Sequence, residues 1–260
     1  MNKKICVGFL LFLISTPCFA TQMAFVFKGY LCSVDMCLNG NFQIGQVVTI
    51  LSKDSEKVCT AQVGESFTAE DEMLKFPAAK LTELKGCNSV SEPFLAIFET
   101  KVKYSVPKAT NLSASDLGAL NKKVKASTAF MEVYESAIVY DYEKKKGESY
   151  STYKLDQLRK SEPTGTRYVI KPGRTLDIIW HKVGKGGSAE GALFGIYQEK
   201  ISPVSGLFKL SAPYVFLLND KIYVLSSKSC QLGCGEVTNE VYEYSDSGFS
   251  KIYSNSDFST

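Results

Sequence analysis

The chain has 260 residues, of which 45% are hydrophobic and 22% charged, and its formal net charge is +3. This hydrophobic fraction, together with 14 Tyr and 16 Phe, excludes a disordered chain and is sufficient for a packed core. No nucleic-acid recognition motif accompanies the basic residues, so we expect no nucleic-acid partner.

Residues 1–20 are typical of a cleaved secretory signal peptide. Two lysines near the start precede an apolar run over 5–14, and residues 18–20 form a small-x-small cleavage pattern. The apolar run is shorter than the roughly 18 residues that a membrane helix needs, and no later stretch approaches that length. We therefore expect a mature chain that begins at Thr21, lies in the periplasm or is secreted, and has no transmembrane segment. An uncleaved anchor is the alternative.

Export predicts that the cysteines form disulfides. Six cysteines remain after cleavage, and an even count in an oxidising compartment is typical of a disulfide framework. Sequence alone does not determine the pairing. Nearness along the chain favours three bonds: Cys32–Cys37, Cys59–Cys87 and Cys230–Cys234.

The last two cysteines, Cys230 and Cys234, have two other interpretations. A zinc site usually takes four Cys or His ligands, and this chain has a single histidine. A thioredoxin-like redox pair has the spacing C-x-x-C at the start of a helix, whereas here the spacing is C-x-x-x-C and a strand-like run follows. We expect a structural disulfide, with no metal and no cofactor.

Residues 21–105 predict a small, disulfide-bearing β-domain. The central pair of strands, separated by a polar turn, has the pattern of a hairpin in a small barrel-like domain. A capping pair predicts a short helical turn over Glu70–Lys75, and a second helix is expected over Pro77–Lys85. The expected strands are Ala24–Tyr30, Phe42–Leu51, Val58–Val63 and Phe94–Thr100.

Val106–Asn111 is the expected linker to a second region, residues 112–260. Ser113, with an acidic residue three positions later, predicts a helix that continues to Ala126. The aromatic and β-branched residues of Phe130–Tyr142 predict a strand.

From Arg167 onward, short strands follow one another at regular spacing. They include hairpins with turns at 219–220 and 245–248. This spacing is typical of an antiparallel sandwich, barrel or propeller-like sheet. The whole chain therefore predicts a β-rich α+β fold: a small N-terminal β-barrel-like domain and a larger antiparallel β region with one or two short helices.

The basic residues are concentrated in the middle of the chain. Residues 101–200 carry 18 basic and 11 acidic residues, a net charge of +7, while the regions on either side are net negative. One cluster is the turn formed by Lys144, Lys145 and Lys146. Such clusters bind polyanions or acidic protein surfaces, or are simply solvated.

The glycine-rich stretch 184–191 is a candidate binding loop, because binding residues concentrate on loops. Trp180 would be its aromatic anchor, His181 its neighbour, and Lys182 and Lys185 its charges. A phosphate loop is not indicated, since a strand-like run follows the glycines and the G-K-[ST] ending is absent. A flexible hairpin connection is the alternative.

Catalysis has little support in the sequence. Any Ser-His-Asp arrangement would have to use His181, the single histidine, with Ser188 and Asp177 nearby, and no G-x-S-x-G motif is present. We therefore expect an exported, non-enzymatic binding protein, of an envelope adaptor or immunity type, that binds a protein or an envelope polyanion. A secreted hydrolase that uses scattered carboxylates or His181 is the alternative.

Overall fold

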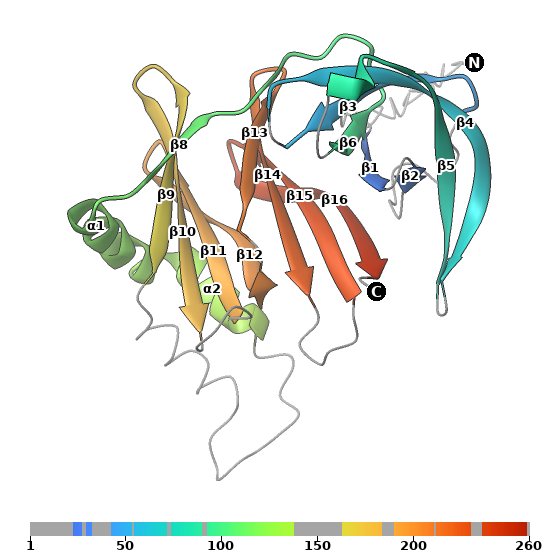
Figure 1. The fold of residues 1–260 in the computed structure, drawn as a ribbon. Helices are drawn as coiled ribbons and strands as arrows, with labels where there is room; N and C mark the ends of the chain where they lie inside the picture. Colours follow the sequence, from blue (N-terminus) through green and yellow to red (C-terminus); the bar gives the residue numbers. More distant parts are fainter. Residues whose placement is uncertain are drawn as a thin grey trace, which may run out of the picture.

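The computed structural model describes residues 23–27, 30–32, 43–53, 55–71, 74–89, 93–137, 163–183, 190–210, 212–229 and 236–258. The expected signal peptide, 1–20, lies outside this part of the chain. The fold class is as predicted: a six-stranded antiparallel barrel is followed by further antiparallel strands and two short helices (Figure 1).

The barrel closes in the strand order β1–β2–β5–β4–β3–β6. Its strands are β1 (Met23–Phe27), β2 (Tyr30–Cys32), β3 (Val47–Ser52), β4 (Val58–Asp71), β5 (Leu74–Lys85) and β6 (Pro93–Ile97), with a short 3-10 turn η1 (Cys87–Ser89) before β6. The predicted hairpin is confirmed, since β3 pairs with β4 from Val47 opposite Gln62 to Leu51 opposite Val58. Small and aliphatic side chains fill the interior, as a narrow barrel requires.

The two helices expected over Glu70–Lys75 and Pro77–Lys85 are wrong. Where the structure describes them, residues of both ranges belong to β4 and β5, which pair from Thr60 opposite Lys85 to Asp71 opposite Leu74. Ala79 and Leu81 are buried in the barrel while Lys80 between them is exposed. The period of two and the ladder of inter-strand hydrogen bonds therefore outweigh the local preference of this segment for a helix.

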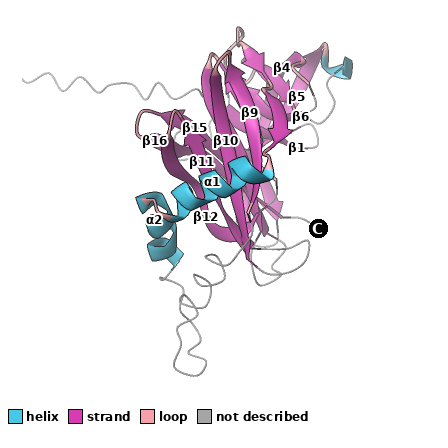
Figure 2. Cartoon of the chain, turned by 90° about the vertical axis from the view of Figure 1, so that its left-hand side faces the viewer, coloured by secondary structure: helices cyan, strands magenta, loops and turns pink. Residues whose placement is uncertain are grey.

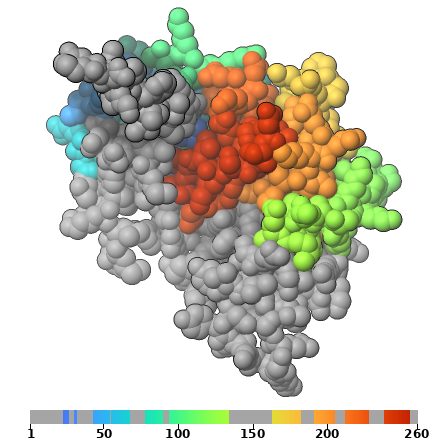
Figure 3. All heavy atoms as spheres, turned by 180° about the vertical axis from the view of Figure 1, so that it is seen from behind, coloured from blue at the N-terminus to red at the C-terminus, as the bar shows by residue number. Residues whose placement is uncertain are grey.

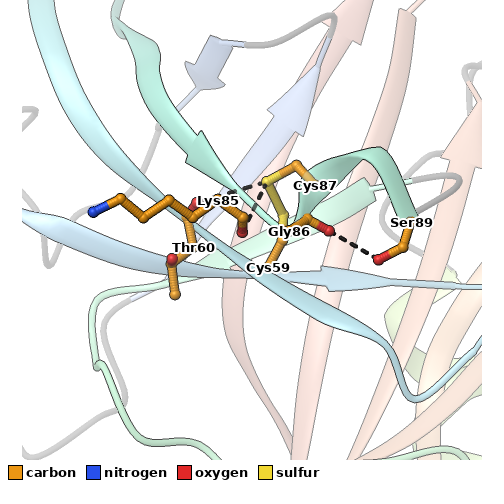
Figure 4. The surroundings of a disulfide bond; sticks show 6 residues. All are labelled: Cys59, Thr60, Lys85, Gly86, Cys87 and Ser89. Atoms are coloured by element: carbon orange, nitrogen blue, oxygen red, sulfur yellow. Dashed lines mark hydrogen bonds between the residues drawn. A yellow bond between two sulfur atoms is a disulfide. The ribbon is translucent and has the colours of Figure 1, made fainter.

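A disulfide joins Cys59, near the start of β4, to Cys87, just after β5, with a Cα–Cα distance of 4.9 Å (Figure 4). This confirms one of the three predicted bonds. Cys32 ends β2, and its side chain is not described. Cys37, Cys230 and Cys234 lie outside the described residues, so the other two bonds stay predictions.

The remaining strands form one branched sheet with the path β16–β15–β14–β12–β11–β10–β9–β8, while β13 pairs with β14 and with β7. The strands are β7 (Tyr104–Ser105), β8 (Lys108–Asn111), β9 (Thr164–Lys171), β10 (Arg174–Val183), β11 (Glu190–Tyr197), β12 (Lys200–Leu210), β13 (Tyr214–Leu218), β14 (Lys221–Ser229), β15 (Glu236–Ser245) and β16 (Gly248–Phe258). Both predicted hairpin turns, at 219–220 and 245–248, are confirmed.

The sheet divides into two layers because β14 is paired along one edge by two different strands. Its first half pairs with β13 and its last two residues pair with β12. Strands β8–β12 thus form one layer and β13–β16 another, and a cluster of aliphatic and aromatic side chains lies between them. The result is a sandwich.

The barrel packs on the other face of the β13–β16 layer. Alternate residues of β13 point to opposite faces, so Val215 and Leu217 pack into the sandwich while Phe216 and Leu218 pack toward the barrel. Phe94 of β6 contacts Phe216 with ring centroids 5.5 Å apart. In the view from behind, the red strands β15 and β16 lie between the blue and cyan barrel and the orange strands (Figure 3).

The two helices cover the outer face of the β8–β12 layer (Figure 2). The first, α1 (Ala114–Lys125), confirms the predicted helix, and Ser113 caps it by accepting a hydrogen bond from the Asp116 N–H at 3.2 Å. No described helix is both long and apolar enough to cross a membrane.

The strand expected over Phe130–Tyr142 is wrong where the structure describes it, because α2 (Thr128–Ala137) is a helix. Ser127 accepts a hydrogen bond from the Phe130 N–H at 3.3 Å, which starts the helix. Phe130 and Val133 then bury against the sheet. One capped turn and one apolar face therefore outweigh the β-propensity of the segment.

The expected linker, Val106–Asn111, contains a strand. Its last four residues form β8 and pair with β9. The division of the chain into domains 21–105 and 112–260 stays a prediction, although barrel and sandwich share the core around Phe94 and Phe216.

Candidate functional site

Trp180 and His181 are neighbours in the sequence but lie on opposite faces of β10. Leu176, Ile178 and Trp180 face the interior of the sandwich, whereas Ile179 and His181 face the helices. This follows from the two-residue period of a strand. The two residues therefore do not form one site.

His181 is fully buried between Phe130 of α2 and Phe194 of β11, with ring centroids 5.8 Å and 5.7 Å away. Burial, together with the smaller effect of the nearby positive charge of Lys125, lowers the pKa of His181 to about 4. A catalytic base has to reach a proton of the substrate. The position of His181 favours a packing role.

Asp177, the expected partner of His181 in a hydrolase, has another function in the fold. Arg167 donates two hydrogen bonds to its carboxylate, at 2.7 Å and 3.0 Å, and lies 3.5 Å from Asp116 of α1. These contacts tie α1 to β9 and β10. Ser188, the third residue of that hypothesis, lies outside the described residues.

Trp180 lines an open cavity of about 410 Å³ at the edge of the sandwich, between the end of β8, the start of β9 and the chain just before β13. We call this cavity the Trp180 groove. Its apolar lining includes Tyr168, Ile178 and Pro213, and its polar lining includes Asn111 and Thr166.

Gly191 of β11 makes room for the indole ring. A Cβ atom at this position would overlap the indole nitrogen of Trp180 and would lie 2.6 Å from the carbonyl oxygen of His181. Gly165 of β9, which lines the groove, makes room for two leucines instead: a Cβ atom there would lie 2.5 Å from Leu112 and 2.9 Å from Leu117 of α1. Each glycine therefore lets a side chain that lines the groove pack closely against a neighbouring strand.

The groove combines apolar surface with neutral polar groups, and no acidic or basic residue lines it among the residues that the structure describes. Burial raises the pKa of Tyr168, so its hydroxyl stays neutral at physiological pH. Neutral hydroxyl and amide groups beside aromatic rings suit a ligand that offers both apolar surface and hydrogen-bonding groups.

The structure does not describe the side chains of the predicted lysines. Lys182 belongs to β10. Lys185, Lys144, Lys145 and Lys146 lie outside the described residues, so their binding role stays a prediction. The lysines of α1 lie in its last turn, where positive charge is favourable beside the free carbonyl groups of a helix end.

Of the described residues that line the groove, Trp180 was predicted as a site residue and the others were not, among them Asn111, Thr166, Tyr168 and Pro213. The alternation of β9 places Thr166 and Tyr168 on one face, which is a signal in the sequence. Their approach to Trp180 depends on the pairing of β9 with β10, and the approach of Pro213 depends on the packing of the two layers.

Within the described part of the chain, no three His, Cys, Asp or Glu side chains are placed to hold a metal ion. Comparisons with models of protein families, with curated proteins and with solved structures found no match to this chain. The candidate site therefore depends on geometry alone.

Proposed function

We propose that this chain is an exported, non-enzymatic binding protein and that the Trp180 groove binds a protein partner. The main support is the half-buried Trp180 beside Tyr168 in an open cavity of about 410 Å³. Aromatic rings supply a large contact area and lose little conformational entropy on binding. The neutral polar groups of the groove orient the bound chain.

A protein suits the groove better than a polyanion does. The described lining carries no lysine or arginine, and a polyanion needs several cations to bind. The hydrolase alternative has weaker support, because His181 is enclosed by aromatic rings and Asp177 is engaged by Arg167.

Export is supported by the signal-like segment 1–20 and by the Cys59–Cys87 bond. Disulfides of this kind form and persist in oxidising compartments. Both features fit a protein that acts in the envelope or outside the cell.

Affinity capture from the envelope fraction, followed by mass spectrometry, tests this function. We expect the mature chain to retain a stoichiometric protein partner, and Trp180→Ala to retain about tenfold less. Retention should persist in large part at high salt, because no charged side chain lines the groove among the residues that the structure describes, and screening acts on charges. Tyr30→Ala, which removes an exposed aromatic ring from the barrel, is the matched control.

If the wild-type chain retains no partner at either salt concentration, the proposal is wrong. A screen of turnover against glycan and peptide substrates would then address the hydrolase alternative. Because Trp180 is the single tryptophan of the chain, its fluorescence reports directly on occupation of the groove.

A further inference from the structure

Strand β8 ends the sheet on the side of the groove. It pairs with β9, no other described strand pairs with it, and its four residues are exposed. It lies beside β9 at the left of Figure 1. An exposed edge strand of this kind presents main-chain groups that pair readily with another extended chain.

The register shows which main-chain groups point outward. The N–H of Leu112 donates to the carbonyl oxygen of Gly165 at 3.0 Å, so this pair is hydrogen-bonded. Bonded and non-bonded pairs alternate along an antiparallel ladder. Thr110 therefore turns its N–H and C=O toward β9, while Ala109 and Asn111 turn theirs away. No described residue bonds these outward groups.

The edge of β8 and the Trp180 groove form one surface. Residues paired across two strands project to the same face, and Asn111 pairs with Thr166 while Ala109 pairs with Tyr168. Asn111 and Thr166 both line the groove. Alternate side chains of a strand added to β8 would therefore point toward the groove.

The opposite face of β8 carries a charge. Lys108 is exposed and, among the described residues, has no carboxylate partner. On an added strand, the side chains that do not point to the groove would lie on the face of Lys108. An acidic residue at such a position complements the lysine.

We propose that an extended segment of the protein partner binds by adding to β8 as a further strand. Its main chain pairs with the outward groups of Ala109 and Asn111, one apolar side chain enters the Trp180 groove, and an acidic residue faces Lys108. Main-chain pairing with pockets for alternate side chains is a common way of binding peptides. This inference rests on the proposed function and adds the conformation and chemistry of the partner.

The variant Ala109→Pro distinguishes strand addition from binding modes that do not use the main chain of β8. Proline removes the outward N–H of residue 109 and leaves each hydrogen bond between β8 and β9 in place. Ala109→Val is the matched control, because valine keeps the N–H and favours a strand. Thermal unfolding of both full-length mature variants checks that the fold is retained.

The probe is the set of peptides that wild-type protein selects from a phage library of short random peptides. We expect the selected peptides to combine apolar residues at alternate positions with an acidic residue. By Trp180 fluorescence, Ala109→Pro should weaken their binding at least about tenfold, and Ala109→Val should change it less than about threefold. On binding, hydrogen exchange should slow at the amides of Ala109 and Asn111.

Two outcomes overturn strand addition: no enrichment of peptides on the wild-type chain, or equal binding to Ala109→Pro and wild type. A wild-type dimer that Ala109→Pro converts to a monomer also overturns it, since the occupant is then a second copy of this chain. If wild type and Ala109→Pro capture the same envelope partner equally, only this inference fails. If wild type captures nothing, the proposed function fails.

Discussion

The side chains of β10 show how much the environment of a residue depends on its face. Trp180 lines the groove and is partly exposed, whereas His181 has no exposed surface. The imidazole of His181 stays neutral because the folded chain removes it from water, and a charge there would lie near Lys125. His181 therefore makes stability depend on pH.

Replacing His181 with Phe should reduce the loss of stability in acid. The pKa of His181 is about 4 in the folded chain and near 6.5 when exposed, so the unfolded chain binds a proton first as the pH falls. The free energy of unfolding then decreases between these two pH values, in total by about 3 kcal/mol, and this contribution is fully present only above pH 6.5.

Urea unfolding of wild type and His181→Phe across this pH range measures the effect. We expect the variant to lose less stability than wild type, because phenylalanine has no proton to bind. Identical pH dependence of the two proteins would show that the imidazole is not kept neutral by burial.

At the scale of elements, local sequence signals predicted the start of a helix and the position of turns better than they predicted whether a segment is a helix or a strand. Ser113 caps α1 as expected, and the turn at 219–220 joins β13 to β14. Residues 130–137 form a helix against their β-propensity, and residues 77–85 form a strand in a segment with helical signals. In both segments, contact with the rest of the fold determines the type of structure: the helix buries area against the sheet, and the strand gains inter-strand hydrogen bonds.

Gly118→Ala should stabilise α1. Gly118 is exposed within the helix, and a Cβ atom there would meet nothing within 4 Å. Alanine lowers the conformational entropy of the unfolded chain, so the free energy of unfolding should rise by about 0.5–1 kcal/mol. Ser113→Ala, which removes the cap of the same helix, should lower it by about 1 kcal/mol. Urea unfolding should show shifts of opposite sign.

Replacing both Cys59 and Cys87 with Ala should destabilise the barrel. The bond closes a loop between residues 28 positions apart, and the chain-entropy model gives about 3–4 kcal/mol for a loop of this length. Urea unfolding of the double variant measures the loss. Addition of reductant to unfolded wild type should lower the free energy of unfolding at least as much, because reductant also opens any other disulfide of the chain. A negligible change in both experiments would show that the Cys59–Cys87 bond is not formed in solution.

At the scale of the whole molecule, the β13–β16 layer contributes side chains to two hydrophobic cores. Residues 215–218 of β13 are all buried, with alternate side chains in the sandwich and toward the barrel. Phe94 of the barrel contacts both Tyr214 and Phe216. Continuous packing of this kind couples the stability of the two halves.

Phe94→Ala should therefore destabilise the sandwich as well as the barrel. Removal of this buried ring should cost about 3–5 kcal/mol, and the unfolding midpoint of Trp180 fluorescence should move with that of far-UV circular dichroism. Leu84→Ala, at an exposed position of β5, should leave both midpoints nearly unchanged. An unchanged Trp180 midpoint in Phe94→Ala would mean that the two halves unfold independently.

The amino-acid sequence by itself determined the β-rich class, the β3–β4 hairpin, the capped helix at Ser113 and the turn at 219–220, and it favoured the pairing of Cys59 with Cys87 that the structure then showed. These features follow from neighbouring residues: alternation, capping side chains, turn residues and nearness along the chain.

Only the tertiary structure showed that Trp180 and His181 lie in different environments and that residues 130–137 are helical. It also showed that Trp180, Tyr168 and Pro213 line one groove. Each of these depends on which distant strand or helix covers a given face. Because that choice is set by burial and main-chain pairing summed over the whole fold, no short stretch of the sequence contains it.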